Sequence, residues 1–351
     1  MTTNYAVATG EFIAEWLEEN GLKQSELARR LGVSRKLVSE LIAGKARLSD
    51  SVAQNLEFAT GVPARVWMNY ELLYRSDAAR LAKDSALAER FSDFARLPLK
   101  YLRLRGVITA AASDKAAVAR QVLSFFEVAD IDTLLSMPGK YVAAYRQSRV
   151  HDADELAVMA WIQAGSAAVT SRDIPPYDPQ ALEALLPQLR ALTILPVPEY
   201  AEKMVTLAET VGVVVIFDKG PERTRCSGLT HWVEGTPVIQ LTDRGKKNDA
   251  LWFTFFHELG HVLLHPGNEV FVENVGADDG REAEADTFAR DLLISPADWA
   301  RRPTRKSQSE VAAFAREIGV HPGIVLGRIH YETGDFKWGH SLKQSIYITE
   351  S

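Results

Sequence analysis

Residues 252–265 form an apolar run that contains an H-E-x-x-H pattern, with His257, Glu258 and His261 at its fixed positions. The other residues of the run are mainly Trp, Phe, Val and Leu, so we expect a buried helix. Residues four apart on a helix project from one face, and His257 and His261 can therefore offer two imidazole nitrogens to one metal ion. A buried histidine pair beside a carboxylate needs such a partner.

Glu258 follows the first histidine directly and is turned away from ligation, which suits a general base. The ion lowers the pKa of a bound water toward neutrality, and Glu258 can accept the proton of that water. This arrangement favours hydrolysis of an amide. We therefore predict a metalloendopeptidase of the H-E-x-x-H type with Zn²⁺ as its cofactor.

A third protein ligand is expected about twenty residues downstream, in residues 281–289. Alanines and leucines define the inner face of a predicted helix there, and Glu282 and Asp286 lie four apart on or beside that face. We assign Glu282 as the third ligand and Asp286 as the carboxylate that holds a histidine ligand by its other ring nitrogen. The spacing also permits the reverse assignment. Glu284 projects elsewhere and is expected to be solvated, although it stays open as a substitute ligand.

His265 is a rival third ligand, because it stands four residues beyond His261. Three histidines at this spacing span about 12 Å along a helix, which is too far for one ion to bridge easily. We expect His265 to line the cleft or to pack at the helix end before Pro266. The longer H-E-x-x-H-x-x-G-x-x-H pattern is absent, since Leu264 and Gly267 occupy its later positions. This argues against the metzincin arrangement.

The stretch from about residue 212 to 327 resembles the ImmA/IrrE family of small gluzincin-like metallopeptidase domains. Six pieces carry the resemblance in order: residues 212–217, 227–228, 237–241, 252–261, 282–289 and 321–328. The resemblance implies a zinc peptidase fold whose characterised members cut repressor proteins. The family commonly has Asn where this chain has Asp286, a departure that leaves the ligand assignment unchanged.

Three further expectations concern this domain. Residues 211–217 and 237–242 are rich in Val and Ile and are expected to be strands. The second of them could pair with an extended peptide if it lies at the edge of the sheet, which the sequence leaves open. Asp249 is placed to cap the helix of the H-E-x-x-H pattern. A tetrahedral oxyanion would need a donor opposite Glu258, and His231 is the candidate.

Residues 23–45 have the pattern of a helix-turn-helix. Gly32 stands at the turn, and Ser34 can cap the second helix. Apolar residues occupy the positions that lock the two helices together: Leu27, Leu31, Val33, Val38 and Leu41. Residues 23–47 contain seven Lys or Arg and two acids, a net charge of +5 in a chain whose net charge is −6. A local basic face on an acidic protein is what contact with DNA phosphates requires.

The expected DNA contacts divide into two groups: Arg35, Lys36 and Ser39 near the bases, and Gln24, Lys45 and Arg47 at the backbone. A first helix at 11–20 and two later helices at 50–60 and 63–75 complete a five-helix unit. This unit resembles the XRE-type DNA-binding domains, and residues 62–67 are similar to the HigA-type antitoxin branch. The resemblance implies a transcriptional regulator that binds a double-stranded operator. Because such regulators usually bind paired half-sites, we expect a homodimer.

Residues 314–329 repeat several features of residues 27–42, including an alanine, a glycine and apolar positions. The second helix of this echo opens with Pro322 and Gly323 and has Arg328 as its basic residue. A helix of this kind can pack but is poorly suited to reading bases. We expect a helical pair within the peptidase domain.

The 351 residues suffice for two or three domains. We predict a mainly α protein with a small α+β domain: a five-helix helix-turn-helix domain at 1–77, a helical middle region at 78–200, and a gluzincin-like metallopeptidase domain at 201–351. Cys226 is the single cysteine, so neither an intramolecular disulfide nor a thiolate cluster is expected. No apolar run approaches about 20 residues and the N-terminus lacks an apolar leader, which favours a cytoplasmic protein without a membrane partner.

Two functions fit these features. In the first, a DNA-binding transcriptional regulator has a zinc metallopeptidase domain that cleaves a regulatory protein, either itself or a repressor partner. In the second, an antitoxin-like or ligand-sensing regulator uses the metallopeptidase fold as a sensor with little or no proteolysis. Glu258 favours the first, because a site kept only for structure needs no general base. The middle region contributes amphipathic helices, whose expected roles are to connect the two domains and to support dimerisation.

Overall fold

The computed structural model describes residues 5–137, 154–170, 172–224, 226–267, 271–272 and 280–348. The chain divides into two compact units: Met1–Ser92 with Ala110–Arg120, and Asp93–Thr109 with Gln121–Ser351. Much of the expected middle region therefore shares a unit with the C-terminal domain. Within that unit, the division at residue 200 stays a proposal.

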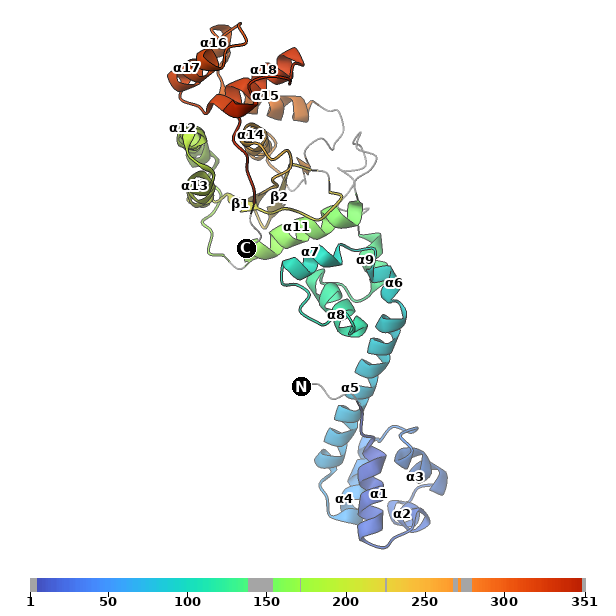
Figure 1. Cartoon of the computed structure of the whole chain (residues 1–351). Helices are drawn as coiled ribbons and strands as arrows, with labels where there is room; N and C mark the ends of the chain where they lie inside the picture. The colour runs from blue at the N-terminus through green and yellow to red at the C-terminus, as the bar shows by residue number, and fades with distance from the viewer. Residues whose placement is uncertain are drawn as a thin grey trace. The chain divides into compact units, whose positions relative to one another are not determined.

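The first unit begins with a helical bundle (Figure 1). The helices are α1 (Thr9–Glu19), α2 (Gln24–Leu31), α3 (Arg35–Ile42), α4 (Asp50–Thr60) and α5 (Ala64–Glu89). Gly32 adopts a left-handed conformation with φ of 67° between α2 and α3. The hydroxyl of Ser34 accepts a hydrogen bond from the Leu37 amide at 3.1 Å and caps α3, as the sequence indicates. Leu27, Leu31, Val38 and Leu41 are buried in the bundle core.

Helix α5 is longer than the segment 63–75 expected from the sequence, since it has 26 residues and runs past residue 77. Its buried Glu71 connects three parts of the bundle. The Glu71 carboxylate accepts hydrogen bonds from Thr9 Oγ1 at 2.7 Å, from the Leu48 amide at 3.2 Å and from Arg75 Nε at 2.8 Å. These bonds satisfy a charge that would otherwise be costly to bury.

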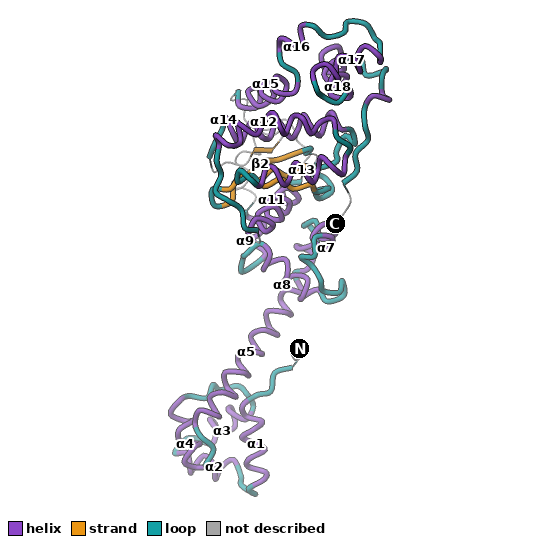
Figure 2. Tube along the Cα trace, turned by 90° about the vertical axis from the view of Figure 1, so that its left-hand side faces the viewer, coloured by secondary structure: helices purple, strands orange, loops and turns teal. Residues whose placement is uncertain are grey.

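The second unit is built mainly from helices around a small sheet (Figures 1 and 2). Its longer helices are α11 (Glu155–Thr170), α12 (Pro179–Ala191), α13 (Val197–Glu209), α14 (Asn248–Leu264), α15 (Arg281–Leu293), α17 (Gln308–Ile318) and α18 (Pro322–Thr333). Shorter helices are α7 (Leu99–Leu104), α9 (Ile131–Ser136) and α16 (Pro296–Ala300). Among the residues that the structure describes, no helix is long and apolar enough to cross a membrane.

Within the part of the chain that the structure describes, four strands form the sheet in the order β1-β3-β2-β4. The strands are β1 (Val214–Phe217), β2 (Gly228–Val233), β3 (Thr236–Leu241) and β4 (Phe271–Val272). β1 is parallel to β3, whereas β2 is antiparallel to both β3 and β4. The two expected strands are present as β1 and β3. β3 has a neighbour on each side, so it is not the edge strand with which an extended peptide could pair.

The sheet lies between α11 and α14 (Figure 2). Because successive residues of a strand point to opposite faces, β2 presents Thr230 to α14 and His231 to α11. α14 contacts β2 and β3, and it contributes fully buried aromatic and aliphatic side chains to the main core of this unit. These side chains are Trp252, Phe255, Phe256, Leu259 and Val262. The apolar run found in the sequence is therefore a central helix of the core.

Helix α14 begins at Asn248, and its N-cap residue is Lys247. The expectation that Asp249 caps this helix is therefore wrong, because Asp249 lies inside the first turn. A C-terminal segment holds this end of the helix instead. The Asn248 amide donates to the Gln344 carbonyl at 3.0 Å, and Asn248 Oδ1 accepts from the Gln344 amide at 3.0 Å. Asp249 Oδ2 accepts from Lys343 Nζ at 2.6 Å.

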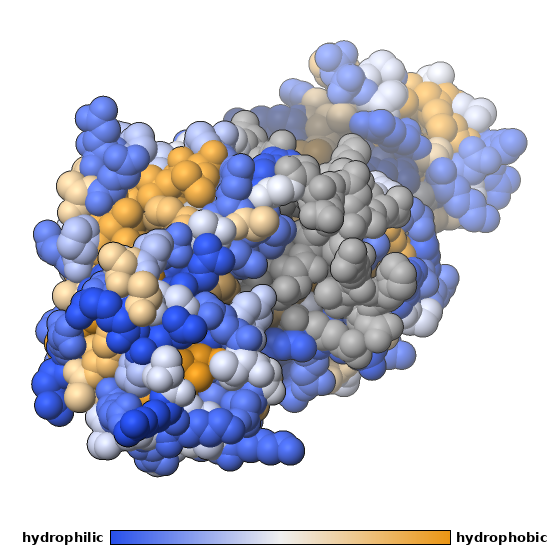
Figure 3. Space-filling view, turned by 90° about the horizontal axis from the view of Figure 1, so that it is seen from above, coloured by the Kyte–Doolittle hydropathy of each residue, from blue (hydrophilic) through white to orange (hydrophobic). Residues whose placement is uncertain are grey.

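Helices α17 and α18 form the pair that echoes the helix-turn-helix pattern, with Gly319 at φ of 71° between them. The apolar face of α18 is buried: Ile324, Val325 and Leu326 belong to the main core, and α18 packs on α14. This helix is an internal element of the domain. In the described part of the face shown in Figure 3, hydrophilic residues predominate and surround several hydrophobic patches.

Candidate metal centre and nucleic-acid interface

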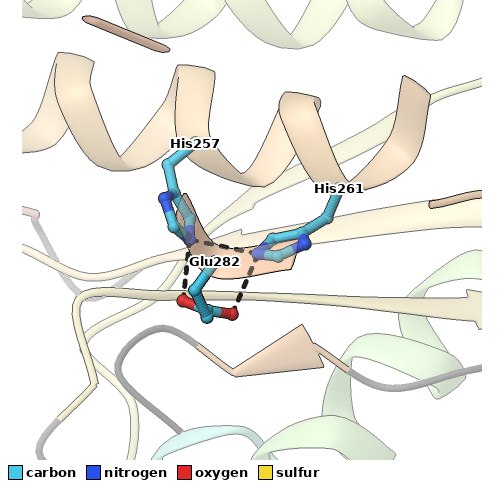
Figure 4. Close-up of side chains that lie close together, drawn as sticks. All are labelled: His257, His261 and Glu282. Atoms are coloured by element: carbon cyan, nitrogen blue, oxygen red, sulfur yellow. Dashed lines mark hydrogen bonds and ion pairs between the residues drawn. The ribbon is translucent and has the colours of Figure 1, made fainter. Parts of the chain in front are cut away.

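Helix α14 places His257, Glu258 and His261 in the interior of the second unit. Their exposed fractions are 2%, 0% and 0%. The buried aromatic side chains of α14 anchor the helix in the main core, and the two histidines project from the helix toward Glu282 (Figure 4). The two imidazoles and this carboxylate meet at one point.

The three groups form a triangle of potential ligand atoms (Figure 4). The Nε2 atoms of His257 and His261 are 3.1 Å apart. Glu282 lies 3.4 Å from His257 Nε2 and 3.2 Å from His261 Nε2. Ligands held about 2.0–2.1 Å from a tetrahedral zinc ion are separated by about 3.3 Å, so the triangle has a suitable size. Two facing imidazole nitrogens and a carboxylate also suit a divalent cation chemically.

Glu282 reaches the histidines because α15 packs very closely against α14. A Cβ atom added to Gly260 would lie 3.1 Å from the Cα of Ala285, so glycine permits this approach. Ala285 and Ala289 are fully buried on the same side of α15. The small residues in both helices therefore determine the position of the third ligand candidate.

Asp286 contacts the outer nitrogen of His257, with Oδ1 2.8 Å from Nδ1. A carboxylate at this position holds the proton on Nδ1 and leaves the lone pair of Nε2 directed at the triangle. Burial lowers the pKa of His257, but hydrogen bonds to Asp286 and Glu282 outweigh it and raise the pKa to about 10, so the metal-free ring carries a second proton on Nε2 that a bound cation would replace. Burial raises the pKa of Glu282, yet hydrogen bonds to the two histidines lower it to about 2. The carboxylates around the triangle thus favour a positive charge at this place, a proton in the metal-free chain or a bound cation.

Strand β2 holds the carboxylate of Glu258 from the other side. The hydroxyl of Thr230 donates to Glu258 Oε2 at 2.6 Å. A Cβ atom on Gly228 would lie 2.9 Å from Glu258 Oε1, so the strand leaves space for the carboxylate only because residue 228 is glycine. Sequence reasoning missed Thr230 and the role of Gly228 beside Glu258, although their separation by two residues would have placed them on one face of a strand.

His231 does not join this cluster. It lies on the face of β2 that packs against α11, close to Gly165 and Gln240, and is 2% exposed. Burial lowers its pKa to about 4. The proposed oxyanion donor is therefore misplaced: alternation along the strand brings Thr230 to Glu258 and turns His231 away.

His265 and Glu284 also lie outside the triangle, but they contact each other. His265 Nδ1 is 3.1 Å from Nδ1 of His261, and His265 Nε2 is 2.9 Å from a Glu284 oxygen. Glu284 was expected to be solvated, and its side chain is indeed 65% exposed. The two residues considered as substitute ligands are therefore placed behind His261, on the side away from Glu282.

The helix-turn-helix presents a polar surface along α3. Arg35, Lys36 and Ser39 are exposed there, whereas Val38 and Leu41 face the core. Lys36 lies 3.7 Å from Glu40 on the same helix. The expected backbone contacts lie nearby in the sequence: Gln24 is half-buried at the start of α2, and Lys45 and Arg47 are exposed after α3. These side chains can reach a ligand without disturbing the bundle core.

A cleft of about 630 Å³ lies at another place in the second unit. Its lining comes mainly from residues 95–101 and 217–223, including Tyr101 and Asp218, and excludes the triangle. Tyr101 donates a hydrogen bond to Asp218 at 2.5 Å. The cleft is therefore separate from the candidate metal centre.

Two family models match the chain. A helix-turn-helix model covers residues 13–67, and a model described as the IrrE N-terminal-like domain covers residues 208–330. The chain fuses an XRE-type helix-turn-helix domain to an IrrE/ImmA-like domain. No curated protein matches it.

The two family matches cover the two candidate sites, the helix-turn-helix surface and the ligand triangle. The helix-turn-helix domain contains α2 and α3, which indicates a DNA-binding regulator. The IrrE-like domain is peptidase-like and contains the sheet, the triangle and Glu258. The predicted fusion and the mainly α fold with a small α+β C-terminal domain are confirmed.

Proposed function

We propose that the protein is a DNA-binding transcriptional regulator whose IrrE-like domain is a zinc-dependent metalloendopeptidase. One observation carries this proposal: Glu258, held by Thr230 at 2.6 Å, follows directly on the first histidine of a ligand triangle of suitable size. Three protein ligands would leave a coordination position for water or substrate, as in catalytic zinc sites. A purely structural zinc site would use four protein ligands and no adjacent base.

The roles of the residues follow from their positions. His257, His261 and Glu282 would hold Zn²⁺, and Asp286 would keep His257 in the tautomer that binds through Nε2. A bound zinc ion supplies Lewis acidity, which lowers the pKa of water and polarises a carbonyl group. Glu258 takes a proton from the attacking water and delivers it to the leaving amine.

The helix-turn-helix would place α3 in the major groove of an operator. Arg35, Lys36 and Ser39 would contact base edges there. Gln24, Lys45 and Arg47 would contact phosphates, which sets the position of the domain on the DNA. We propose a homodimer in the cytoplasm, because two copies of the domain would bind the two half-sites of an operator.

The proposed substrate is a regulatory protein, either another copy of this chain or a repressor partner. Covalent connection to a DNA reader raises the effective concentration of the peptidase near proteins bound at the same operator. Cleavage of such a protein would relieve repression. The fusion therefore favours a peptidase with few substrates.

A second candidate is an antitoxin-like or ligand-sensing regulator with little or no proteolysis. The complete burial of Glu258 and His261 favours it, because a peptide bond must reach these side chains to be cut. In this alternative, metal or ligand binding would alter DNA affinity without cleavage.

The variant Glu258→Gln separates the two functions. We expect it to retain zinc, measured by elemental analysis of the purified chain, and to lose cleavage. Profiling of protein N-termini in cells expressing each form identifies the products, and operator binding is titrated in parallel. Asp291→Asn is the control on the same helix as Glu282, because the Asp291 carboxylate pairs with its neighbour Arg290 and is not among the ligand atoms of the triangle. If wild type and Glu258→Gln yield the same N-termini and the same DNA response to zinc, the peptidase proposal is wrong and the sensor is favoured.

A further inference from the structure

We propose that His265 and Glu284 form an outer hydrogen-bonded chain that positions His261 as a metal ligand. The inference rests on the proposed metal centre and assigns a role to two residues outside it. His265 and Glu284 act as positioning residues, since neither lies in the triangle of ligand atoms.

The end of α14 explains how His265 reaches His261. The helix ends at Leu264, and His265 is its C-cap residue with φ of −125° and ψ of 53°, which is not helical. The side chain therefore does not continue along the helix face. It turns back, so that the Nδ1 atoms of His265 and His261 are 3.1 Å apart. Only 6% of the His265 side chain is exposed.

The order of the hydrogen-bonding groups lets us assign the proton positions along this chain. An ionised Glu284 can only accept, so His265 Nε2, at 2.9 Å, must donate to it. This places the lone pair of a neutral His265 on Nδ1, and we assign the proton of the next bond to His261 Nδ1, 3.1 Å away. This leaves the lone pair of His261 on Nε2, which is 3.2 Å from Glu282 and 3.1 Å from His257 Nε2.

Both histidine ligands thus have an outer partner at Nδ1, supplied by different means, and turn Nε2 toward the triangle. A carboxylate contacts His257 Nδ1 directly through Asp286, whereas His261 Nδ1 is held through a second imidazole. Helix α15 supplies all three carboxylates, from Glu282, Glu284 and Asp286. Its close contact with α14 therefore sets the ligand and both outer supports together.

The side chains of His265 and Glu284 differ in exposure, so we expect their substitutions to lower zinc affinity by different amounts. His265 is nearly buried, whereas the Glu284 side chain is 65% exposed and water competes for its contact. Loss of an outer partner of a metal-binding histidine typically lowers metal affinity about 10-fold to 100-fold. We expect a loss in this range for His265→Phe and a smaller loss, about threefold, for Glu284→Gln.

Zinc affinity of the full chain, measured by competition with a chromophoric chelator, tests the inference. His265→Asn is the conservative variant, because its amide oxygen can stand near the place of Nδ1 and accept from His261. We expect it to retain most of the affinity that His265→Phe loses. Asp291→Asn, on the same helix as Glu284, should match wild type. Equal affinities for wild type and His265→Phe would overturn the inference.

A second measurement uses the metal-free chain. Long-range ¹H–¹⁵N spectra of the imidazoles report which nitrogen of His261 carries the proton. We expect the Nδ1–H tautomer in wild type and His265→Asn, and a shift toward Nε2–H in His265→Phe. An unchanged tautomer in His265→Phe would contradict the hydrogen-bonded chain.

Glu282→Gln separates failure of this inference from failure of the proposed function. If wild type and Glu282→Gln bind zinc equally weakly, the proposed metal centre is wrong, and the positioning role is overturned with it. If Glu282→Gln weakens zinc binding but His265→Phe changes neither affinity nor tautomer, the metal centre stands and the outer chain alone is rejected. Loss of affinity in both variants, with rescue by His265→Asn, supports both.

Discussion

The hydroxyl of Thr230 lies 2.6 Å from a carboxylate oxygen of Glu258, so a residue of β2 holds the side chain that we propose as the general base on α14. A hydrogen bond to a charged group contributes about 1.5–3 kcal/mol. We therefore expect Thr230→Val to lower kcat for peptide cleavage about 10-fold to 100-fold. Zinc content should remain that of wild type, because Thr230 does not contact the ligand triangle. Thr230→Ser keeps a hydroxyl and should retain most of the activity; equal loss in both variants would argue against this role.

The close packing of α14 on α15 predicts that Gly260→Ala disturbs the metal centre. The new Cβ would lie 3.1 Å from the backbone of Ala285, so the helices must separate by a few tenths of an ångström. Overpacking of this kind costs about 1–3 kcal/mol of unfolding free energy. Thermal denaturation should show a lower Tm, and chelator competition should show weaker zinc binding. Gly267→Ala, whose added Cβ meets nothing within 4 Å, is the control.

The proposed recognition helix predicts a DNA-binding defect that leaves the fold intact. Arg35→Ala combined with Lys36→Ala removes two exposed cations from α3. We expect operator affinity to fall at least about 10-fold and its dependence on salt to flatten, because fewer counterions are released. Fluorescence anisotropy at several salt concentrations measures both. Arg316→Ala on α17 should match wild type; an unchanged affinity and slope in the α3 variant would reject the assignment.

Burial of His231 predicts a loss of stability in acid. Its pKa is lowered from 6.5 to about 4 in the folded chain, so between these values the unfolded chain binds more protons. Stability from this residue is therefore complete above about pH 6.5 and declines as the pH falls toward 4, by an amount on the order of 3 kcal/mol.

Denaturant unfolding of wild type and His231→Gln in the presence of a chelator tests this pH dependence. The chelator keeps zinc release out of both measurements. We expect the variant to lose less stability than wild type between pH 6.5 and about 4, because it lacks the group whose protonation favours unfolding. Parallel pH profiles of the two proteins would show that His231 does not contribute.

The sequence predicted those parts of the site that depend on local periodicity. His257 and His261 lie one helical turn apart in a helix that the apolar run identified, and Glu282 and Asp286 lie one turn apart in the next. Helical spacing alone decides which of these side chains share a face. The candidate ligands could therefore be chosen before their distances were known.

The errors concern contacts that depend on strand register or on where a helix ends. A shift of one residue in β2 would exchange the faces of Thr230 and His231, and pairing with β3 and β4 sets that register. His265 lies at the helix end, as expected, but its return toward His261 could not be foreseen, because it depends on where the helical conformation stops. The register of β2 and the end of α14 both depend on tertiary structure, so they cannot be predicted from periodicity in the sequence.

The contact between Asn248 and Gln344 shows that the segment matched by the family model is shorter than the segment needed for a stable fold. The matched region ends at residue 330, yet the start of the ligand-bearing helix is tied to residues 343 and 344. Upstream, α11 covers the other face of the sheet and also lies outside the match. A fragment cut at residues 208–330 would expose one face of the sheet and release the first turn of α14. The bounds of the family match thus show which part of the chain is recognised from its sequence. A fragment that folds by itself with an intact metal centre also needs the flanking segments, namely α11 and the residues after 330.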